Sequence, residues 1–354
     1  MRVIGRDPDQ TDPEDGSERT DRSPATGRLG RYRARDGSEG GRVGLDLDRP
    51  HVAVVVGKRG AGKSYTLGVI AEALARAAGT VPVVVDPMGT FGPLARSALD
   101  VRAVPPAVRA DALSPRTWCE ALGLDPGGGP GSLVWRAASE AASLDGMRSA
   151  VTGATADDAT RRAALNHLDL AESWGVFGTA GLPNETGAVV DLAGLDRAAM
   201  DAVCAGLAGR LYRRCLADRG VALPWLLVDE AHPFFDGIAG RSLRRLLTRG
   251  RQPGVSVVAA TQRPSALPDV ARSQADIVVI HRTTGRADRE ALAAARPSYA
   301  VESLGERMPS APGEALILDD ATETVHTVRI RERETPHGGD SPRASRRAGT
   351  SEHT

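Results

Sequence analysis

The 354-residue chain contains very little lysine, few aromatic residues and only three cysteines. Lys58 and Lys63 are the two lysines, and arginine supplies every other permanently basic side chain. Because an ammonium and a guanidinium bind anions differently, a lysine kept in an arginine-rich chain suggests a specific role. Aromatic residues make up 3% of the sequence, so a core must come mainly from Ala, Val, Leu and Ile.

Other absences narrow the class of protein. The cysteines form no CxxC pair and no metal-ligand spacing, so free buried thiols in a reducing compartment are expected. No apolar run reaches the roughly 18–20 residues of a membrane span, and no apolar signal region begins the chain. We therefore expect a soluble, cytoplasmic protein without membrane contact. The formal net charge is zero, which argues neither for nor against nucleic acid.

Composition divides the chain into a central domain and two tails. Residues 1–44 and 334–354 are rich in Arg, Asp, Gly, Pro and Ser, and we expect both to be disordered. Over 45–333, short β-branched runs alternate with helical stretches, which predicts an α/β domain with a mostly parallel sheet covered by helices. An Ala- and Arg-rich region at about 92–185 is expected to be a helical insertion. The strand candidates are 52–57, 81–86, 187–192, 225–230, 255–261 and 275–281, with a closing hairpin near 314–330.

The sequence GKRGAGKS matches the phosphate-loop pattern GxxxxGK[ST] between a predicted strand and a predicted helix. Its glycines let backbone N–H groups point at a phosphate, next to the positive end of the helix. Lys63 would reach the β- and γ-phosphates of ATP, and the Ser64 hydroxyl would bind Mg²⁺. A Gly-rich turn with an incidental lysine is the alternative, and the pattern leaves the role of Lys58 open. The expected nucleotide-binding residues are Gly57, Lys58, Arg59, Gly60, Ala61, Gly62, Lys63, Ser64 and Tyr65.

Polar residues end two further apolar strands. In a P-loop enzyme, Asp229 would hold the Mg²⁺ shell and Glu230 would polarise the attacking water. This pair favours an ATP hydrolase over a kinase, whose nucleophile is a substrate hydroxyl. A solvated strand end is the alternative. Gln262, after the strand 255–261, is a candidate for orienting that water or reporting the state of the γ-phosphate; otherwise it is a polar loop residue.

The segment GRSLRRLLTRGRQPG predicts a basic helix. Arg241, Arg244, Arg245 and Arg249 recur at helical spacing on one face, with leucines on the other. One interpretation is a solvated face in an arginine-rich protein. The other is a surface that faces DNA or a neighbouring subunit, with one arginine reaching the neighbour's ATP.

Taken together, the motifs over about 46–330 resemble the HerA/FtsK group of P-loop ATPases, and most closely the HerA-like (DUF87-type) DNA translocases. The segments that carry this resemblance are GKRGAGKS, VVVDPMGTF, VVDLAGL, LLVDEAH, GRQPGVSVVAATQRPS and GEALIL. The family implies a RecA-like fold, a hexameric ring and ATP-driven translocation of double-stranded DNA, with the nuclease NurA as partner in archaeal HerA systems. It makes Arg251, in the GRxxG segment, a candidate for an arginine acting in trans, and Arg49 a second one.

The chain departs from this family at two places. Thr90 and Phe91 stand where the family has Glu and Tyr, so the roles of those side chains do not carry over. HerA proteins usually have an N-terminal β-barrel, for which residues 1–44 are too short, so the NurA partnership and the hexamer need support of their own. A DEAH-box helicase needs two RecA-like domains, which the chain cannot supply. The alternatives left open are an ATP-dependent switch or assembly ATPase acting on protein partners without DNA, and an ATPase that energises secretion or conjugation.

Overall fold

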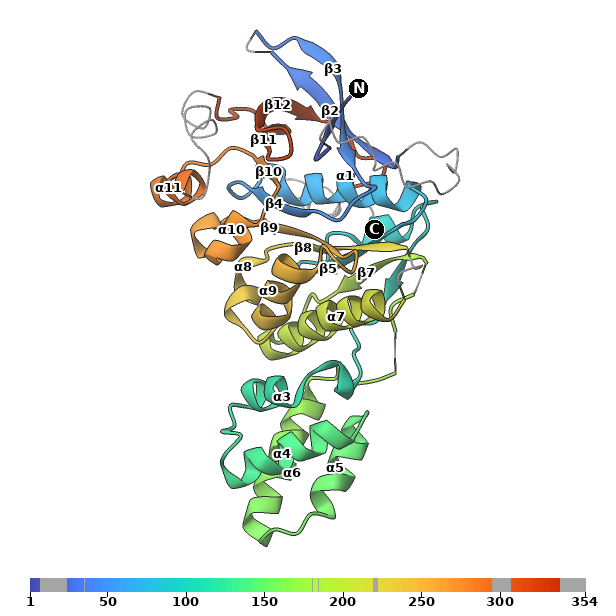
Figure 1. Ribbon diagram of the computed structural model, residues 1–354, viewed down its shortest axis with the longest axis vertical. Coiled ribbons are helices and arrows are strands. Elements are labelled where there is room, and N and C mark those ends of the chain that lie inside the picture. Colours follow the sequence, from blue (N-terminus) through green and yellow to red (C-terminus); the bar gives the residue numbers. More distant parts are fainter. Residues whose placement is uncertain are drawn as a thin grey trace, which may run out of the picture.

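A computed structural model describes most of the chain as one α/β unit. The described residues are 1–6, 24–34, 36–179, 181–183, 185–218, 222–294 and 307–337. Twelve strands in this part of the chain form a single sheet in the order β1-β3-β2-β12-β11-β10-β4-β9-β8-β5-β7-β6. Helices lie on both faces of the sheet (Figure 1). The expected sheet architecture is confirmed.

Seven neighbouring strands form a parallel core. They are β10 (Ile277–Ile280), β4 (Val52–Val56), β9 (Ser256–Thr261), β8 (Leu223–Val228), β5 (Thr80–Asp86), β7 (Gly187–Asp191) and β6 (Val101–Val104). All six strand candidates in this region are confirmed, and β6 is an addition that the sequence did not predict. Side chains alternate between two apolar clusters: Val55 contributes to one, and Val54 and Val56 to the other. Burial on both faces explains why these strands are apolar throughout.

Helices cover each face of this core. α1 (Lys63–Arg76) packs on one face through residues such as Leu67, Ile70 and Leu74. The other face packs against α7, α8, α9, α10 and α11, while Leu94 of α2 joins the cluster on the α1 side (Figure 1). The helices of the main domain are α1, α2 (Gly92–Ala95), α7 (Arg197–Ala217), α8 (His232–Asp236), α9 (Ala239–Arg249), α10 (Asp269–Ser273) and α11 (Arg286–Ala294), with the 3₁₀ turns η1 (Ala110–Ala112) and η2 (Pro264–Ala266). None of the described helices is long and apolar enough to cross a membrane.

The prediction that residues 1–44 are disordered was wrong for the described part of that region. Three strands extend the sheet: β1 (Arg2–Ile4), β2 (Thr26–Arg33) and β3 (Glu39–Asp46). β2 pairs with β12 (Thr324–Ile330), whose own partner β11 (Glu314–Asp319) confirms the predicted closing hairpin. Several of the few large apolar side chains here, such as Leu29, Val43 and Leu45, are buried in the cluster that contains α1, so composition alone was misleading.

The two predicted tails also include residues outside the description. Residues 7–23, 35 and 338–354 are not among the described residues. Residues 334–337, expected to be disordered, are described and follow β12 across α1, where Thr335 is 4% exposed. Hydrogen bonds to Glu72 of α1 order these residues, and no local sequence pattern predicts such contacts.

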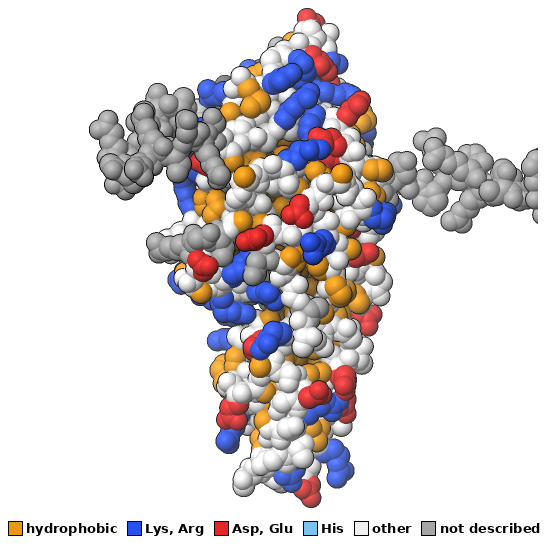
Figure 2. All heavy atoms as spheres, turned by 90° about the vertical axis from the view of Figure 1, so that its right-hand side faces the viewer, with side chains coloured by type: hydrophobic (Ala, Val, Ile, Leu, Met, Phe, Trp, Pro, Cys, Tyr) orange, Lys and Arg blue, Asp and Glu red, His pale blue; other side chains and the backbone are white. Residues whose placement is uncertain are grey.

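The expected insertion at about 92–185 contains a helical subdomain. Its helices are α3 (Pro115–Leu122), α4 (Gly129–Glu140), α5 (Leu144–Thr152) and α6 (Asp158–Ser173). They pack together below the main domain, and the molecule narrows toward them (Figures 1 and 2). The buried Trp118 indole N–H donates a 2.9 Å hydrogen bond to the carbonyl of Ala110, which ties α3 to η1. The helical subdomain takes up less of the sequence than the expected 92–185, because β6 within that range joins the main sheet.

Candidate active site

The phosphate-loop sequence forms the turn between β4 and α1. Gly60 and Gly62 adopt φ angles of 74° and 116°, values that favour glycine. α1 begins at Lys63, and no side chain caps its N-terminus. The first-turn N–H groups therefore lack a side-chain acceptor and form, with the loop, a suitable site for an anion.

Two predicted catalytic side chains and two predicted metal ligands meet at this loop. The Ser64 hydroxyl lies 2.7 Å from Asp229 Oδ2, and Lys63 Nζ lies 3.9 Å from Glu230 Oε1. Burial lowers the pKa of Lys63, although Glu230 and Asp229 act in the opposite direction. Burial likewise raises the pKa of Asp229, which the hydrogen bond from Ser64 partly offsets. These pKa shifts show that the lysine and aspartate lie where solvent stabilises charge poorly, so a charged ligand would interact with them strongly.

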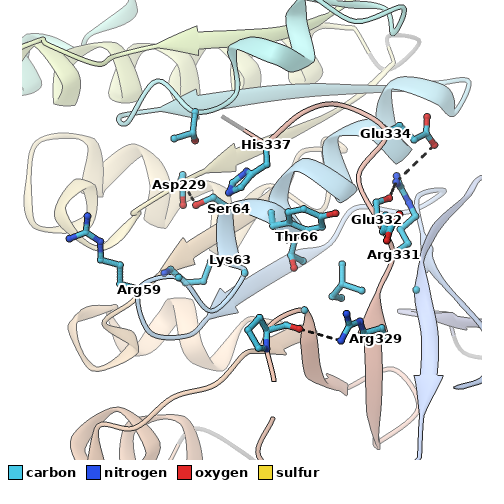
Figure 3. A pocket seen from close by; sticks show the side chains of 18 of the residues that line it. Arg59, Lys63, Ser64, Thr66, Asp229, Arg329, Arg331, Glu332, Glu334 and His337 are labelled. Atoms are coloured by element: carbon cyan, nitrogen blue, oxygen red, sulfur yellow. Dashed lines mark hydrogen bonds and ion pairs between the residues drawn. The ribbon is translucent and has the colours of Figure 1, made fainter. Parts of the chain in front are cut away.

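A cleft of about 990 Å³ opens above these side chains. This volume is at the upper end of the usual range for small-molecule sites. Figure 3 shows Lys63, Ser64 and Asp229 on one side of the cleft, with Arg329 of β12 and Arg331 just after that strand on the other. The predicted nucleotide-binding residues that line it are Arg59, Gly60, Gly62, Lys63, Ser64 and Tyr65.

Three loop residues do not line the cleft but shape it. Gly57 approaches the side chain of His281 so closely that an added Cβ would come within 2.7 Å of it. Ala61 is 3% exposed and packs inward. Lys58 contributes its backbone: its carbonyl accepts from Lys63 Nζ at 3.4 Å, and its N–H donates to Arg282. The Lys58 side chain is therefore not assigned to the site.

The structure separates the remaining candidates from this cleft. β9 lies between β4 and β8, but Gln262 directly after it is not among the cleft-lining residues. Arg251 is exposed and follows α9, away from the cleft of its own chain. Arg49 precedes β4, at the opposite end of that strand from the phosphate loop. Neither arginine completes the site within the described residues of one chain.

The basic helix α9 does not present one free arginine face. Arg241 forms a 2.7 Å ion pair with Glu120 of α3, and Arg244 donates to a backbone carbonyl of α8 at 3.0 Å. Arg245 stacks over the Tyr212 ring at 4.1 Å. The leucines of α9 are buried as predicted, but three of its arginines hold the fold together.

His281 supports the phosphate loop from below, and sequence analysis missed it. Its Nδ1 lies 2.8 Å from the carbonyl of Glu314, and its Nε2 lies 2.8 Å from Thr66 Oγ1. A carbonyl can only accept, so Nδ1 carries the hydrogen and Thr66 donates to Nε2. Burial lowers the pKa of His281 to about 4, so the ring is neutral. The signal was present as the polar end of the strand IVVIH.

The segment after β12 is fastened to α1 by Glu72, a second group that sequence analysis missed. Glu72 is 0% exposed and accepts from Arg331 at 2.7 Å and from the Thr335 hydroxyl at 2.7 Å. The backbone N–H of Arg333 donates to the Tyr65 hydroxyl at 2.7 Å. This fastening carries His337 to the edge of the cleft, where its ring lies 5.6 Å from that of Tyr65.

The two positions that depart from the family motif have distinct surroundings. The Asp86 carboxylate at the end of β5 accepts from the backbone N–H of Phe91 at 2.8 Å. Phe91 is 0% exposed and belongs to the core. Thr90 lines the cleft and offers a hydroxyl rather than a carboxylate.

The donor set fits Mg²⁺ bound together with phosphates. Among the described residues, no three His, Cys, Asp or Glu side chains converge on a point. The Ser64 hydroxyl and Asp229 carboxylate are adjacent hard oxygen donors at the mouth of the phosphate loop. Mg²⁺ is usually held by one or two protein oxygens plus water and phosphate, so this sparse set is appropriate.

Comparison with known families identifies part of this unit. Residues 28–138 match the family model described as helicase HerA, central domain. The resemblance to HerA/FtsK-type P-loop ATPases is confirmed. The HerA match includes the phosphate loop and begins inside β2, within the region that composition had suggested was disordered.

Solved structures share the fold of this unit at low sequence identity. VirB4 of Thermoanaerobacter pseudethanolicus superposes with a TM-score of 0.66 at 14% identity, covering 87% of this chain and 97% of that one. The bacterial conjugative coupling protein TrwBdeltaN70, in its unbound monoclinic form, gives a TM-score of 0.53 at 16% identity, covering 84% of this chain and 90% of that one. The RecA-like P-loop fold is thereby confirmed. No curated protein matches the chain.

Proposed function

We propose that the chain is an Mg²⁺-dependent ATPase of the HerA type that translocates double-stranded DNA as an oligomer. One observation carries the ATPase part: Lys63 and Ser64 of the phosphate loop meet Asp229 and Glu230, directly after β8, in a single cleft. This arrangement supplies a cation for the phosphates, oxygen ligands for a metal and a carboxylate for water.

Each side chain has a role in hydrolysis. Lys63 binds the β- and γ-phosphates, while Ser64 and Asp229 hold Mg²⁺, which when bound neutralises phosphate charge. Glu230 orients a water molecule and accepts its proton as the water oxygen attacks the γ-phosphorus. The bond from that phosphorus to the β,γ-bridging oxygen breaks, and ADP leaves with phosphate. Because Glu230 contacts Lys63 at 3.9 Å, arriving phosphates would replace this partner and release the carboxylate for its role.

Translocation of DNA is supported by the HerA central-domain match. In an oligomer, Arg251 could reach the cleft of a neighbouring chain, since it is exposed and its own cleft is elsewhere. Such an arginine acting in trans typically raises the hydrolysis rate by about 10³–10⁵. A NurA-type nuclease is a further partner to test, by co-purification with and without DNA.

One observation favours a second candidate, an ATP-dependent switch acting on protein partners without DNA. Three arginines of α9 remain exposed but make contacts within the chain, and Arg241 is paired with Glu120, so this face offers DNA fewer free cations than the sequence suggested. On the face shown in Figure 2, acidic and basic side chains are interspersed.

DNA-stimulated hydrolysis separates the two functions. ATP turnover would be measured for the wild type and for Glu230→Gln, with and without saturating duplex DNA at low and high salt. We expect DNA to stimulate the wild type and salt to weaken this effect steeply, because phosphate contacts release counterions. Glu230→Gln should bind ATP and turn it over about 10²–10⁴-fold more slowly. Turnover that duplex DNA leaves unchanged at low salt would contradict translocation and favour the switch.

A further inference from the structure

Glu230 has an unusual backbone conformation and, in the described part of the chain, an unpaired carboxylate oxygen. Its φ angle of 44° is in the left-handed region, which non-glycine residues rarely adopt. Its N–H donates to the carboxylate of the preceding Asp229 at 3.0 Å. Glu230 Oε2 is buried and has no hydrogen-bond partner among the described residues. Leaving a buried acceptor unpaired is unfavourable, so this oxygen is poised to gain a partner.

His232 is the nearest candidate for that partner. Its Nδ1 lies 3.7 Å from Glu230 Oε2, just beyond hydrogen-bond distance. The ring extends from the start of α8, and 17% of the side chain is exposed. The backbone around it is fixed, because the N–H of Ala231 donates to Ala260 of β9 at 2.7 Å. A small rotation of the side chain would close the gap without moving β8.

The same nitrogen already contacts β9. His232 Nδ1 lies 3.1 Å from the hydroxyl of Thr261, which is 0% exposed. The N–H of Arg263 donates to that hydroxyl at 3.0 Å and occupies one of its two acceptor positions, while the hydroxyl hydrogen is available for donation to Nδ1. In this arrangement Nδ1 is the acceptor of a neutral imidazole, with its hydrogen on Nε2.

The charged surroundings agree with a neutral ring. Burial, followed by Arg263, lowers the pKa of His232, and Asp236 acts in the opposite direction. Arg197 and Lys63 add smaller effects that also lower this pKa. The ring therefore lies between Glu230, which follows β8, and Thr261 of β9, without carrying a charge of its own.

We propose that His232 is a positioning residue for hydrolysis. The Glu230 carboxylate and the Thr261 hydroxyl compete for a hydrogen bond with its Nδ1. This inference rests on the proposed ATPase function. When phosphates take up Lys63, Glu230 loses that contact and binds His232 instead. The imidazole releases its Nε2 proton to solvent and takes one on Nδ1, with no change in charge, and Nδ1–H donates to Glu230 Oε2. Glu230 is then held for the attacking water, and Thr261 is released beside Gln262.

The test compares two substitutions at His232 in the full chain. His232→Ala removes the contact, whereas His232→Asn keeps an amide near the position of Nδ1 that can donate or accept. We expect His232→Ala to lower kcat about 10- to 100-fold, because a misplacement of about 1 Å at the reacting centre can cost about 100-fold. The affinity for ATP should stay unchanged, which also reports a folded site. His232→Asn should recover part of the lost rate.

A double-mutant cycle distinguishes positioning from general structural damage. If His232 acts through Glu230, His232→Ala should have little further effect on the residual rate of Glu230→Gln. An equal loss in both backgrounds, or a normal kcat for His232→Ala beside an active wild type, would overturn the inference while leaving the ATPase function intact. A wild type that does not hydrolyse ATP would instead refute the proposed function, and the inference with it.

Discussion

The Ser64 hydroxyl lies 2.7 Å from Asp229 Oδ2, although 165 positions separate the two residues in the sequence. The contact forms because β4 and β8 run parallel in one sheet with only β9 between them, so their carboxyl ends meet at the same edge. This edge is where open α/β sheets bind ligands.

Asp229→Asn should weaken the contribution of Mg²⁺ to nucleotide binding. The amide keeps the shape of the side chain and can still accept from Ser64, but it loses the charge that attracts the metal. We expect the affinity for ATP with Mg²⁺ to fall on the order of 10- to 100-fold, and the affinity in EDTA to change little. Titration of a fluorescent ATP analogue with and without Mg²⁺ checks this, and equal losses in both conditions would contradict the metal role.

Lys63→Ala should weaken ATP binding on the order of 10- to 100-fold, because a buried ammonium that binds phosphate is lost. The matched control is Lys58→Ala, since the Lys58 side chain is not among the residues that line the cleft. That variant should keep its affinity within about twofold. Calorimetric titration of both variants decides the assignment, and a stronger loss in Lys58→Ala would reverse it.

Arg251→Ala should lose turnover but regain part of it when mixed with Glu230→Gln. In a mixed oligomer, a chain with an intact Glu230 can receive Arg251 from its neighbour. The control mixes Arg251→Ala with the double variant Arg251→Ala/Glu230→Gln, which has no arginine to supply. Activity in the first mixture alone supports action in trans, and no recovery in any ratio of the two chains counts against it.

We expect the folded protein to lose stability at alkaline pH as His51 is deprotonated. Burial alone would lower the pKa of His51, but the 2.7 Å hydrogen bond with Asp276 and the nearby carboxylate of Asp46, 3.7 Å away, outweigh it and raise the pKa to about 9. Because the folded-state pKa is above the usual 6.5, protonated His51 stabilises the folded protein fully below pH 6.5. This contribution disappears as the pH rises through about 9. The rise corresponds to roughly 3 kcal/mol. Urea unfolding from pH 6 to 10 should show the wild type losing its advantage over His51→Gln across this window; a constant difference would contradict the pKa.

Glu72→Ala should destabilise the fold, because it leaves the buried guanidinium groups of Arg331 and Arg333 without their carboxylate. Breaking a buried ion pair in this way costs on the order of 3–5 kcal/mol. The control is Arg76→Ala, which removes an exposed pair with Glu334 in the same segment and should cost less than about 1 kcal/mol. Equal losses of unfolding free energy in the two variants would show that burial is not the cause.

Much of the parallel core could be predicted from sequence, because strands buried on both faces are continuously apolar and β4, β5, β8 and β9 have that pattern. β2 and β3 could not be predicted, since they contain arginines and glycines and only a few side chains, such as Leu29 and Val43, are buried. β2 pairs with β12, which lies about 300 residues away in the chain, and β3 joins the sheet through β2.

The sequence by itself determined the phosphate loop and the acidic strand end, because GxxxxGKS and DE require only local spacing to be recognised. Tertiary structure alone decided which groups surround them. His281 beneath the loop, Glu72 under the C-terminal segment and Thr261 against His232 all come from distant parts of the chain. Such contacts depend on strand order and helix packing, which bring separate segments to one edge of the sheet and leave no periodic trace in the sequence.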